Sequence, residues 1–149
     1  MRVLLQRVTR ASVRIDGRTV AEIGGGLVLF VGVGASDGDA DADAMAVRVA
    51  GLRIFADDAR RTNRSILEAG GAALVVSQFT LYADTSRGRR PGFSGAAAAE
   101  VAERIYGRFA DGLRVAGIDP VRSGRFGEAM EVELVNDGPF TIWLDSAAR

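Results

Sequence analysis

The segment Ser77–Thr80 places hydroxyl and amide groups inside an otherwise apolar stretch, Leu74–Leu81. Such groups suit the binding of a polar substrate, and a Thr or Ser hydroxyl can attack an ester. Period-two alternation would put Gln78 and Thr80 on the face opposite Ser77 and Phe79. Taken alone, this spacing favours another interpretation, in which Gln78 and Thr80 bond a neighbouring backbone or lie on a solvated face.

A second candidate segment begins at Asn136 and continues as Asp137, Gly138, Pro139 and Phe140. These residue types favour a hairpin turn between two strands. Because only about 5–6% of X–Pro bonds are cis, the sequence alone gives little support for a cis bond here.

The third candidate is a basic loop within residues 85–95, which carries Arg87, Arg89 and Arg90 beside Gly88 and Pro91. Most loops of this kind are simply solvated. Beside a functional site, however, the guanidinium groups could hold phosphates in a bidentate manner.

Missing residue types exclude several chemistries. The 149 residues include no His and no Cys, and all 19 basic residues are Arg. A Ser-His-Asp triad, a Cys nucleophile, a His/Cys zinc site and a disulfide are therefore excluded. Schiff-base chemistry and a P-loop lysine are excluded as well. We expect neither a metal nor a cofactor.

A glycine pattern follows the apolar stretch Leu27–Val33, with Gly32, Gly34 and Gly38. The third glycine is one residue late for a dinucleotide-binding G-x-G-x-x-G motif, because Asp37 occupies that place. The acidic residues that follow would also repel a pyrophosphate. We therefore reject a Rossmann site.

An acidic run marks the expected start of a helix. Ser36 and Asp39 fit a capping box, and carboxylates are favourable in a first helical turn. A metal site is the less favoured alternative. The run consists of Asp37, Asp39, Asp41 and Asp43.

Length and charge favour one cytoplasmic domain spanning residues 1–149. The formal net charge is +0, so no overall field attracts DNA or anionic lipid. The N-terminal stretch contains Arg7 and Arg10 and does not resemble a signal peptide. The longest apolar run, Leu27–Val33, is too short to span a bilayer.

The elements that must position the candidate residues are strands and two helices in one α/β unit. An Asp16-Gly17 turn predicts a hairpin, and the uninterrupted apolar run Leu27–Val31 predicts a strand buried on both faces. A second helix is expected from about Ala96. The remaining expected strands are Val3–Val8, Ala11–Ile15, Thr19–Ile23, Leu74–Leu81, Met130–Leu134 and Thr141–Leu144; the helical stripes are Met45, Val49 and Leu52, and Val101, Ile105, Phe109 and Leu113.

Over its whole length the chain resembles the D-aminoacyl-tRNA deacylase family. The most specific matching segments are Ser77–Asp84 and Asn136–Pro139. The others are Met1–Val8, Ala11–Val13, Leu52–Phe55 and Gly88–Pro91.

The resemblance implies a three-layer β/β/α fold, with two packed sheets and two main helices on one side. It also implies a homodimer that acts on the 3′ end of a tRNA carrying a D-amino acid. Ser77, Gln78, Phe79 and Thr80 would line the pocket, and a cis Gly138-Pro139 pair would enter it from the partner subunit. Arg7 would brace that pair, and Met130 would help to line the adenosine pocket.

The chain departs from the family pattern in two places. Phe140 stands where a small β-branched residue is usual, which affects the packing after the Gly-Pro pair. Ala98 and Ala99 replace two prolines before the second helix, which would let that helix begin earlier.

An aminoacyl ester is already activated, so positioning and oxyanion stabilisation matter most. With no His, Lys or Cys to activate Thr80, we favour attack by water, with N–H groups near Phe79 and Thr80 holding the oxyanion and the ribose hydroxyl relaying the proton. Thr80 as nucleophile is the alternative mechanism. Two other functions stay open: a general Thr/Ser esterase and a non-catalytic ligand-binding domain.

Carbonyl groups of Gly138 and Pro139 could bind the substrate α-ammonium group and exclude an L side chain. Glycine has no side chain to exclude, so glycyl-tRNA should also be cleaved. Arg87, Arg89 and Arg90 would contact the tRNA.

Overall fold

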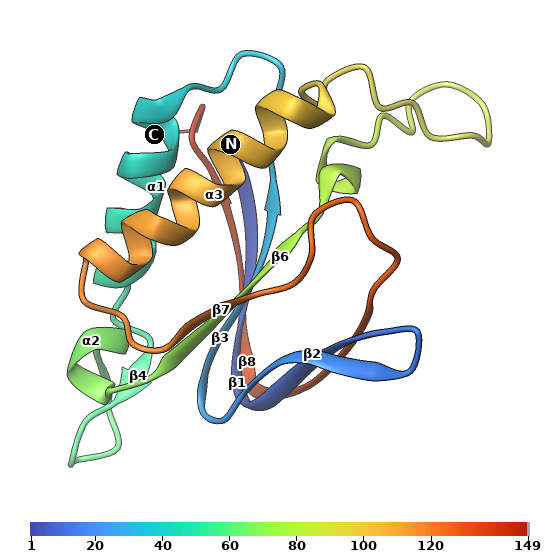
Figure 1. Ribbon diagram of the computed structural model, residues 1–149. Helices are drawn as coiled ribbons and strands as arrows, with labels where there is room; N and C mark the ends of the chain where they lie inside the picture. The colour runs from blue at the N-terminus through green and yellow to red at the C-terminus, as the bar shows by residue number, and fades with distance from the viewer. Residues whose placement is uncertain (149) are drawn as a thin grey trace.

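The computed structural model describes residues 1–148, which form a single α/β domain with two main helices, α1 and α3, on one side of a bent sheet (Figure 1). The strands are β1 (Arg2–Ile15), β2 (Arg18–Ile23), β3 (Gly26–Gly32), β4 (Phe55–Ala56), β5 (Thr62–Arg64), β6 (Ala72–Ser77), β7 (Val121–Ser123) and β8 (Glu131–Asp145). The helices are α1 (Asp39–Gly51), α2 (Ile66–Ala69), the 3₁₀ helix η1 (Phe79–Tyr82) and α3 (Ala99–Val115). None of the helices in this part of the chain is long and apolar enough to cross a membrane.

The predicted fold, two packed sheets with two main helices on one side, is confirmed in part: the helices lie as expected, but β1 joins the strands into one large sheet. One edge of β1 pairs with β3 and then with β2, and the other edge pairs with β8 along nearly its whole length. β6 and β7 extend the sheet beyond β3 in parallel orientation, so that it has six strands and is mixed. β4 and β5 form a separate small hairpin.

β1 is one continuous strand, although the sequence predicts two, Val3–Val8 and Ala11–Ile15. The predicted hairpin at its end is confirmed: Asp16 and Gly17 both have positive φ, 50° and 73°, as a tight two-residue turn requires.

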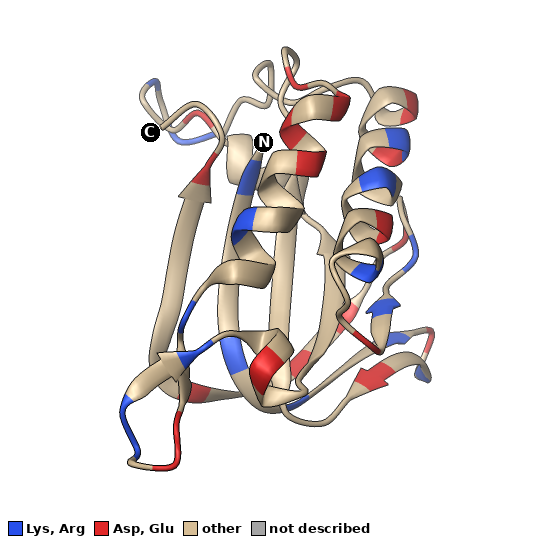
Figure 2. Ribbon diagram, turned by 90° about the vertical axis from the view of Figure 1, so that its left-hand side faces the viewer, with Lys and Arg blue, Asp and Glu red and all other residues tan. Residues whose placement is uncertain are grey.

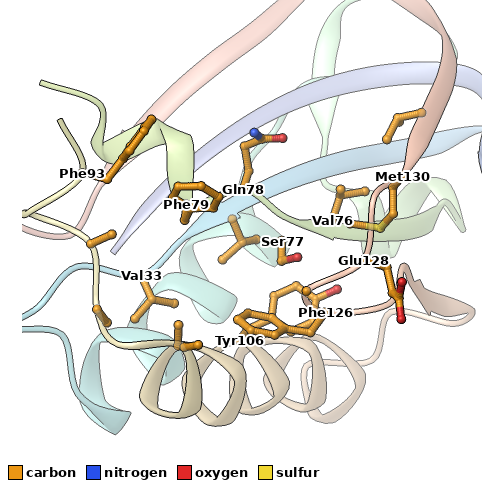
Figure 3. Close-up of a pocket in the computed structure, with 17 residues that line it drawn as sticks. Val33, Val76, Ser77, Gln78, Phe79, Phe93, Tyr106, Phe126, Glu128 and Met130 are labelled. Carbon is orange, nitrogen blue, oxygen red and sulfur yellow. The ribbon is translucent and has the colours of Figure 1, made fainter. Parts of the chain in front are cut away.

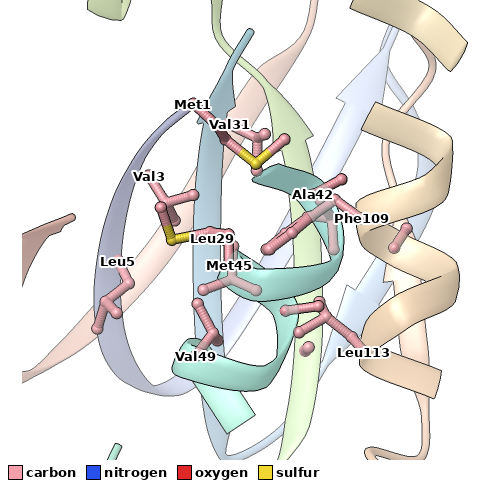
Figure 4. Packing of buried hydrophobic residues seen from close by; sticks show 14 of the residues in the cluster. Met1, Val3, Leu5, Leu29, Val31, Ala42, Met45, Val49, Phe109 and Leu113 are labelled. Carbon is pink, nitrogen blue, oxygen red and sulfur yellow. The ribbon is translucent and has the colours of Figure 1, made fainter. Parts of the chain in front are cut away.

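The main core lies between the sheet and the two helices (Figure 4). The predicted stripe of α3 is confirmed at Ile105, Phe109 and Leu113, which are fully buried, whereas Val101 is 41% exposed. From α1, Met45 and Val49 face this core. The packing of the two helices against the sheet therefore supports the strands that carry the site.

A second core lies on the other face of β3 and β6. Alternate residues of β3 face the two cores: Leu29 faces the helices and Val28 faces the far side. This confirms that Leu27–Val31 is buried on both faces. The far side is covered by β2, the second half of β1 and the first half of β8, so the bent sheet supplies the layer that a second sheet was expected to supply.

The predicted capping box at the start of α1 is wrong. The N-cap is Gly38, and its N–H donates to the Asp41 carboxylate at 2.9 Å. Asp39 and Asp43 instead pair with Arg104 and Arg108 of α3, where charges of both signs face each other (Figure 2). The hydrogen bond from Arg108 holds the pKa of Asp43 below its usual value. Most of the acidic run thus serves helix capping and helix pairing.

Candidate active site

The segment Ser77–Thr80 marks the end of a strand rather than its middle. The N–H of Gln78 donates to the Val31 carbonyl at 2.7 Å, after which the chain turns with Gln78 at φ −147° and ψ 72°. The N–H of Leu81 then donates to the Gln78 carbonyl at 3.2 Å and begins η1. The predicted strand Leu74–Leu81 therefore ends at Ser77, and the expected alternation of faces across Ser77–Thr80 is wrong.

A cavity of about 620 Å³ opens between this strand end, α3 and the segment before β8 (Figure 3). That volume lies within the range of small-molecule sites. Its walls are largely apolar and aromatic, with a few polar groups. The labelled lining residues are Val33, Val76, Ser77, Gln78, Phe79, Phe93, Tyr106, Phe126, Glu128 and Met130.

Four of the predicted site residues line this cavity: Ser77, Gln78, Phe79 and Met130. Thr80 does not; it is exposed on η1, and its hydroxyl oxygen accepts a hydrogen bond from the Gln78 side-chain amide. Within residues 1–148, no carboxylate is hydrogen-bonded to the Thr80 hydroxyl. The structure thus gives Thr80 an amide neighbour and no general base.

Three aromatic residues of the cavity, Phe93, Tyr106 and Phe126, were not predicted from the sequence as site residues. Phe93 packs edge-on against Phe79 with ring centroids 5.0 Å apart, and Tyr106 lies 5.9 Å from Phe126. The Tyr106 hydroxyl donates to the Val75 carbonyl at 2.8 Å, and burial raises the pKa of this phenol.

A partial signal for these residues was present. Tyr106 follows Ile105 in the buried stripe of α3, and buried tyrosines usually have a partner for their hydroxyl. The cavity residues Phe126 and Glu128 lie in an irregular segment with no periodicity to identify them.

The Asn136–Phe140 segment is a bulge within β8, so the predicted hairpin turn is wrong. Gln6 pairs with Thr141 and Val8 pairs with Asn136, which leaves residues 137–140 of β8 opposite Arg7 alone. The Asn136 amide closes the bulge by donating to the carbonyls of Arg7 at 2.9 Å and Phe140 at 3.1 Å. The Gly138–Pro139 peptide bond is cis, as the family resemblance implied; Asp119–Pro120 is also cis.

Arg7 contacts both ends of this bulge. Its Nε lies 2.8 Å from a carboxylate oxygen of Asp137, and its guanidinium carbon lies 4.2 Å from the centre of the Phe140 ring. The Nε–H direction does not meet hydrogen-bond geometry, so the first contact is an ion pair without a hydrogen bond. Nη1 donates to the Ile54 carbonyl. Phe140, the unusual residue at its position, is thus covered by the Arg7 side chain.

Gly138 and Pro139 are exposed and do not line the cavity of their own chain. The structure therefore separates the predicted site residues into two places. One is the cavity at the end of β6, and the other is the bulge of β8 with Arg7.

The basic loop is held closed at its base. Asp84 and Gly92 exchange two backbone hydrogen bonds of 2.8 and 2.9 Å, and the loop between them projects beyond η1 (Figure 1). Hydrogen bonds from Ser86 keep the pKa of Asp84 below its usual value. Arg87, Arg89 and Arg90 are all exposed, and Phe93 at the loop's end lines the cavity.

Among residues 1–148, no group of three or more Asp or Glu side chains is placed to hold a metal ion.

Known proteins are similar to this chain in sequence and in fold. Residues 4–145 match the family model described as D-Tyr-tRNA(Tyr) deacylase. A D-aminoacyl-tRNA deacylase of Paracoccus denitrificans is 54% identical over 149 residues, which cover 100% of this chain and 99% of the relative. Another, of Thermomicrobium roseum, is 57% identical over 147 residues, which cover 99% of this chain and 95% of that relative.

Two solved structures have the same architecture. One, named c-Myc DNA Unwinding Element Binding Protein, has a TM-score of 0.91 and 35% identity and covers 97% of this chain and 98% of its own. The other, a probable eukaryotic D-amino acid tRNA deacylase, has a TM-score of 0.82 over 96% and 97% of the two chains. At 21% identity the second shows the fold alone.

Proposed function

Because the chain belongs to the D-Tyr-tRNA(Tyr) deacylase family, we propose that it is a D-aminoacyl-tRNA deacylase, an ester hydrolase that releases a free D-amino acid and tRNA. The observation that carries this conclusion is the identity of 54% to such a deacylase over the full length. With tRNA as its substrate, the protein would act in the cytoplasm.

The cavity at the end of β6 is the proposed binding site for the aminoacylated 3′-terminal adenosine. Its volume of about 620 Å³ and its aromatic walls suit a nucleoside, because a base has two faces on which such side chains can stack. Met130 and Phe126 would contact the adenosine, and Ser77, Gln78 and Phe79 would lie next to the ester.

We propose that water performs the attack. It adds to the ester carbonyl carbon, the bond to the ribose oxygen breaks, and a proton reaches that oxygen through the vicinal ribose hydroxyl. The N–H groups of Phe79 and Thr80 precede the first hydrogen bond of η1 and so remain free to stabilise the oxyanion. The Gln78 amide next to the Thr80 hydroxyl supports a positioning role for Thr80.

The active form is proposed to be a homodimer in which the β8 bulge of one subunit enters the cavity of the other. Two features support this arrangement: the bulge is exposed and lies outside its own cavity, and large apolar side chains are exposed on the same chain, with Phe79 at 57% and Trp143 at 47%. Carbonyl groups of Gly138 and Pro139 would then bind the α-ammonium group and occupy the space of an L side chain.

Arg87, Arg89 and Arg90 are the proposed tRNA contacts, because their loop is exposed and ends at the cavity residue Phe93. Replacing all three with Ala should weaken tRNA binding and reduce its salt dependence, since each lost phosphate contact lowers the slope. An unchanged slope would exclude this loop. Duplex DNA of equal length is the control ligand. Because the net charge of the protein is +0, it has no general attraction to nucleic acid, and we expect it to prefer tRNA.

The deciding experiment compares hydrolysis of D-tyrosyl-, L-tyrosyl- and glycyl-tRNA by the purified protein and by Thr80→Ala. We expect the D and glycyl esters to be cleaved, the L ester to be spared, and Thr80→Ala to retain part of the activity. Rapid L-tyrosyl-tRNA hydrolysis would refute the stereochemical proposal. Covalent trapping on Thr80 would establish the nucleophile mechanism, and the absence of any hydrolysis would favour a non-catalytic domain.

A further inference from the structure

Two glycines, one at the end of β3 and one just after it, lie close to the aromatic ring of Tyr82. A Cβ atom on Gly34 would lie 2.6 Å from the Tyr82 hydroxyl oxygen, and one on Gly32 would lie 3.2 Å from ring carbon Cδ2. A Cβ on Gly95, from the segment before α3, would lie 3.4 Å from the same ring. The Tyr82 ring therefore fills space that three glycines leave open.

The hydroxyl of this ring is held by a buried carboxylate. Tyr82 donates to Oδ2 of Asp37 at 3.2 Å, and the same oxygen accepts the Gly34 N–H at 2.6 Å. The Asp37 side chain is 8% exposed, and its other oxygen contacts the α-amino group of Met1. A carboxylate with this many partners is fixed in place, so the hydroxyl bonded to it is fixed as well.

The outer face of the ring is covered by Arg2. The Arg2 guanidinium lies 4.3 Å from the ring centre of Tyr82, and its Nη1 donates to the Leu81 carbonyl at 2.9 Å. The Nε of Arg2 donates to Oδ2 of Asp145 at 3.1 Å, which orients the guanidinium group. The last two residues of η1 are therefore tied to β1, β8 and the loop after β3.

We propose that Tyr82, held by Asp37, is a positioning residue that fixes η1 and thereby the direction of the N–H groups of Phe79 and Thr80. This rests on the proposed function, in which those groups stabilise the oxyanion. A 3₁₀ helix of four residues has little stability of its own, so its orientation depends on contacts at its ends. Position 34 requires glycine because the ring approaches the backbone there to within 3 Å of where a Cβ atom would lie.

Tyr82→Phe tests this by removing only the hydroxyl. We expect kcat for D-tyrosyl-tRNA to fall about fivefold, the value of one net hydrogen bond, with KM changed less than twofold. Hydrogen exchange should become faster at the amides of Leu81 and Ala83, which donate to the Gln78 and Thr80 carbonyls. An unchanged kcat, or a raised KM with the wild-type kcat, would overturn the proposal.

Gly34→Ala provides a second perturbation from the opposite side, because the added methyl group must displace the ring. We expect a fall in kcat of tenfold or more, since small displacements of catalytic groups are costly. Ser65→Ala is the control: Ser65 caps α2, far from η1 in the fold, and its loss should lower stability without changing kcat. If Ser65→Ala lowers kcat as much as Tyr82→Phe does, general stability is the cause and the proposal fails.

The inference and the proposed function can fail separately. Wild-type protein that does not hydrolyse D-aminoacyl-tRNA would refute the function. Exchange at the amides of η1 would still report whether Tyr82 and Asp37 hold this helix, and exchange in Tyr82→Phe equal to that of the wild type would refute the inference whatever the activity.

Discussion

The stereochemical proposal depends on the shape of the β8 bulge, and Arg7 is one of the side chains that hold it. Asp137 immediately precedes the Gly138–Pro139 pair and Phe140 immediately follows it, and Arg7 contacts both. Arg7→Gln removes the charge while keeping a polar side chain in the same place. We expect the bulge to lose its fixed shape and the enzyme to lose discrimination between D and L substrates.

The size of the effect follows from the two contacts. The ion pair has one partner nearly buried and the other half exposed, with side-chain exposures of 12% for Arg7 and 47% for Asp137. Solvent screening limits such a pair to about 1 kcal/mol. The stacking on Phe140 adds about 0.5–1 kcal/mol. A loss of about 1.5–2 kcal/mol corresponds to a fall of roughly ten- to thirtyfold in the D:L ratio of kcat/KM.

The assay measures kcat/KM for D- and L-tyrosyl-tRNA with Arg7→Gln and with Arg10→Gln as the matched control. Arg10 lies on the same strand and pairs with Glu133 at 2.9 Å, but both side chains are exposed and neither contacts the bulge. Arg10→Gln should keep the wild-type ratio. A folded Arg7→Gln protein with the same ratio as the control would refute the reasoning.

Three further predictions concern stability, each measured by urea unfolding. Phe109→Ala should lower the free energy of unfolding by about 3–5 kcal/mol, because this ring is 0% exposed between α3 and the sheet; a loss below 1 kcal/mol would contradict its place in the core. Gly26→Ala should cost about 3 kcal/mol or more, since φ is +157° and the new Cβ would lie 1.9 Å from the Ala72 carbonyl oxygen; wild-type stability would show that β3 and β6 can separate there. Burial raises the pKa of both Tyr82 and Tyr106, so the stability that their neutral forms provide is intact below pH 10 and is lost as pH rises through their folded pKa values. With no Lys, Cys or His in the chain, the free energy of unfolding should decline as pH rises above about 10, and the decline should be shallower in Tyr82→Phe; an equal slope in the variant would exclude Tyr82.

Much of the fold follows from local patterns that the chain cannot satisfy in another way. Five apolar residues in a row at Leu27–Val31 require burial on both faces, and the bent sheet provides it. The Asp16-Gly17 pair suits a turn with positive φ at both positions. The stripe of α3 has a helical period, and its members Phe109 and Leu113 lie in the core.

The features that the sequence did not predict share a physical cause, because each of them depends on residues far away in the chain. The apolar pattern continues through Leu81, but β6 ends at Ser77 because its last ladder bond, from Gln78 to Val31, depends on where β3 ends. The bulge in β8 depends on Asn136 bonding to the Arg7 carbonyl, 129 residues earlier in the chain. A sequence pattern shows that a turn residue is present, but the partner strand decides whether it forms a turn or a bulge.

In the mechanism proposed for this hydrolase, which has no His, Lys or Cys, the catalytic groups come from the main chain and from the substrate, and this changes which residues matter. Main-chain N–H and carbonyl groups are present in every protein, so their catalytic value comes only from being held in one direction. In this chain the groups proposed to hold them are Tyr82 with Asp37 at η1 and Arg7 at the bulge. The side chain of Thr80, which touches neither a base nor the cavity wall, should therefore matter less than these supporting residues, although it is closer to the proposed reaction.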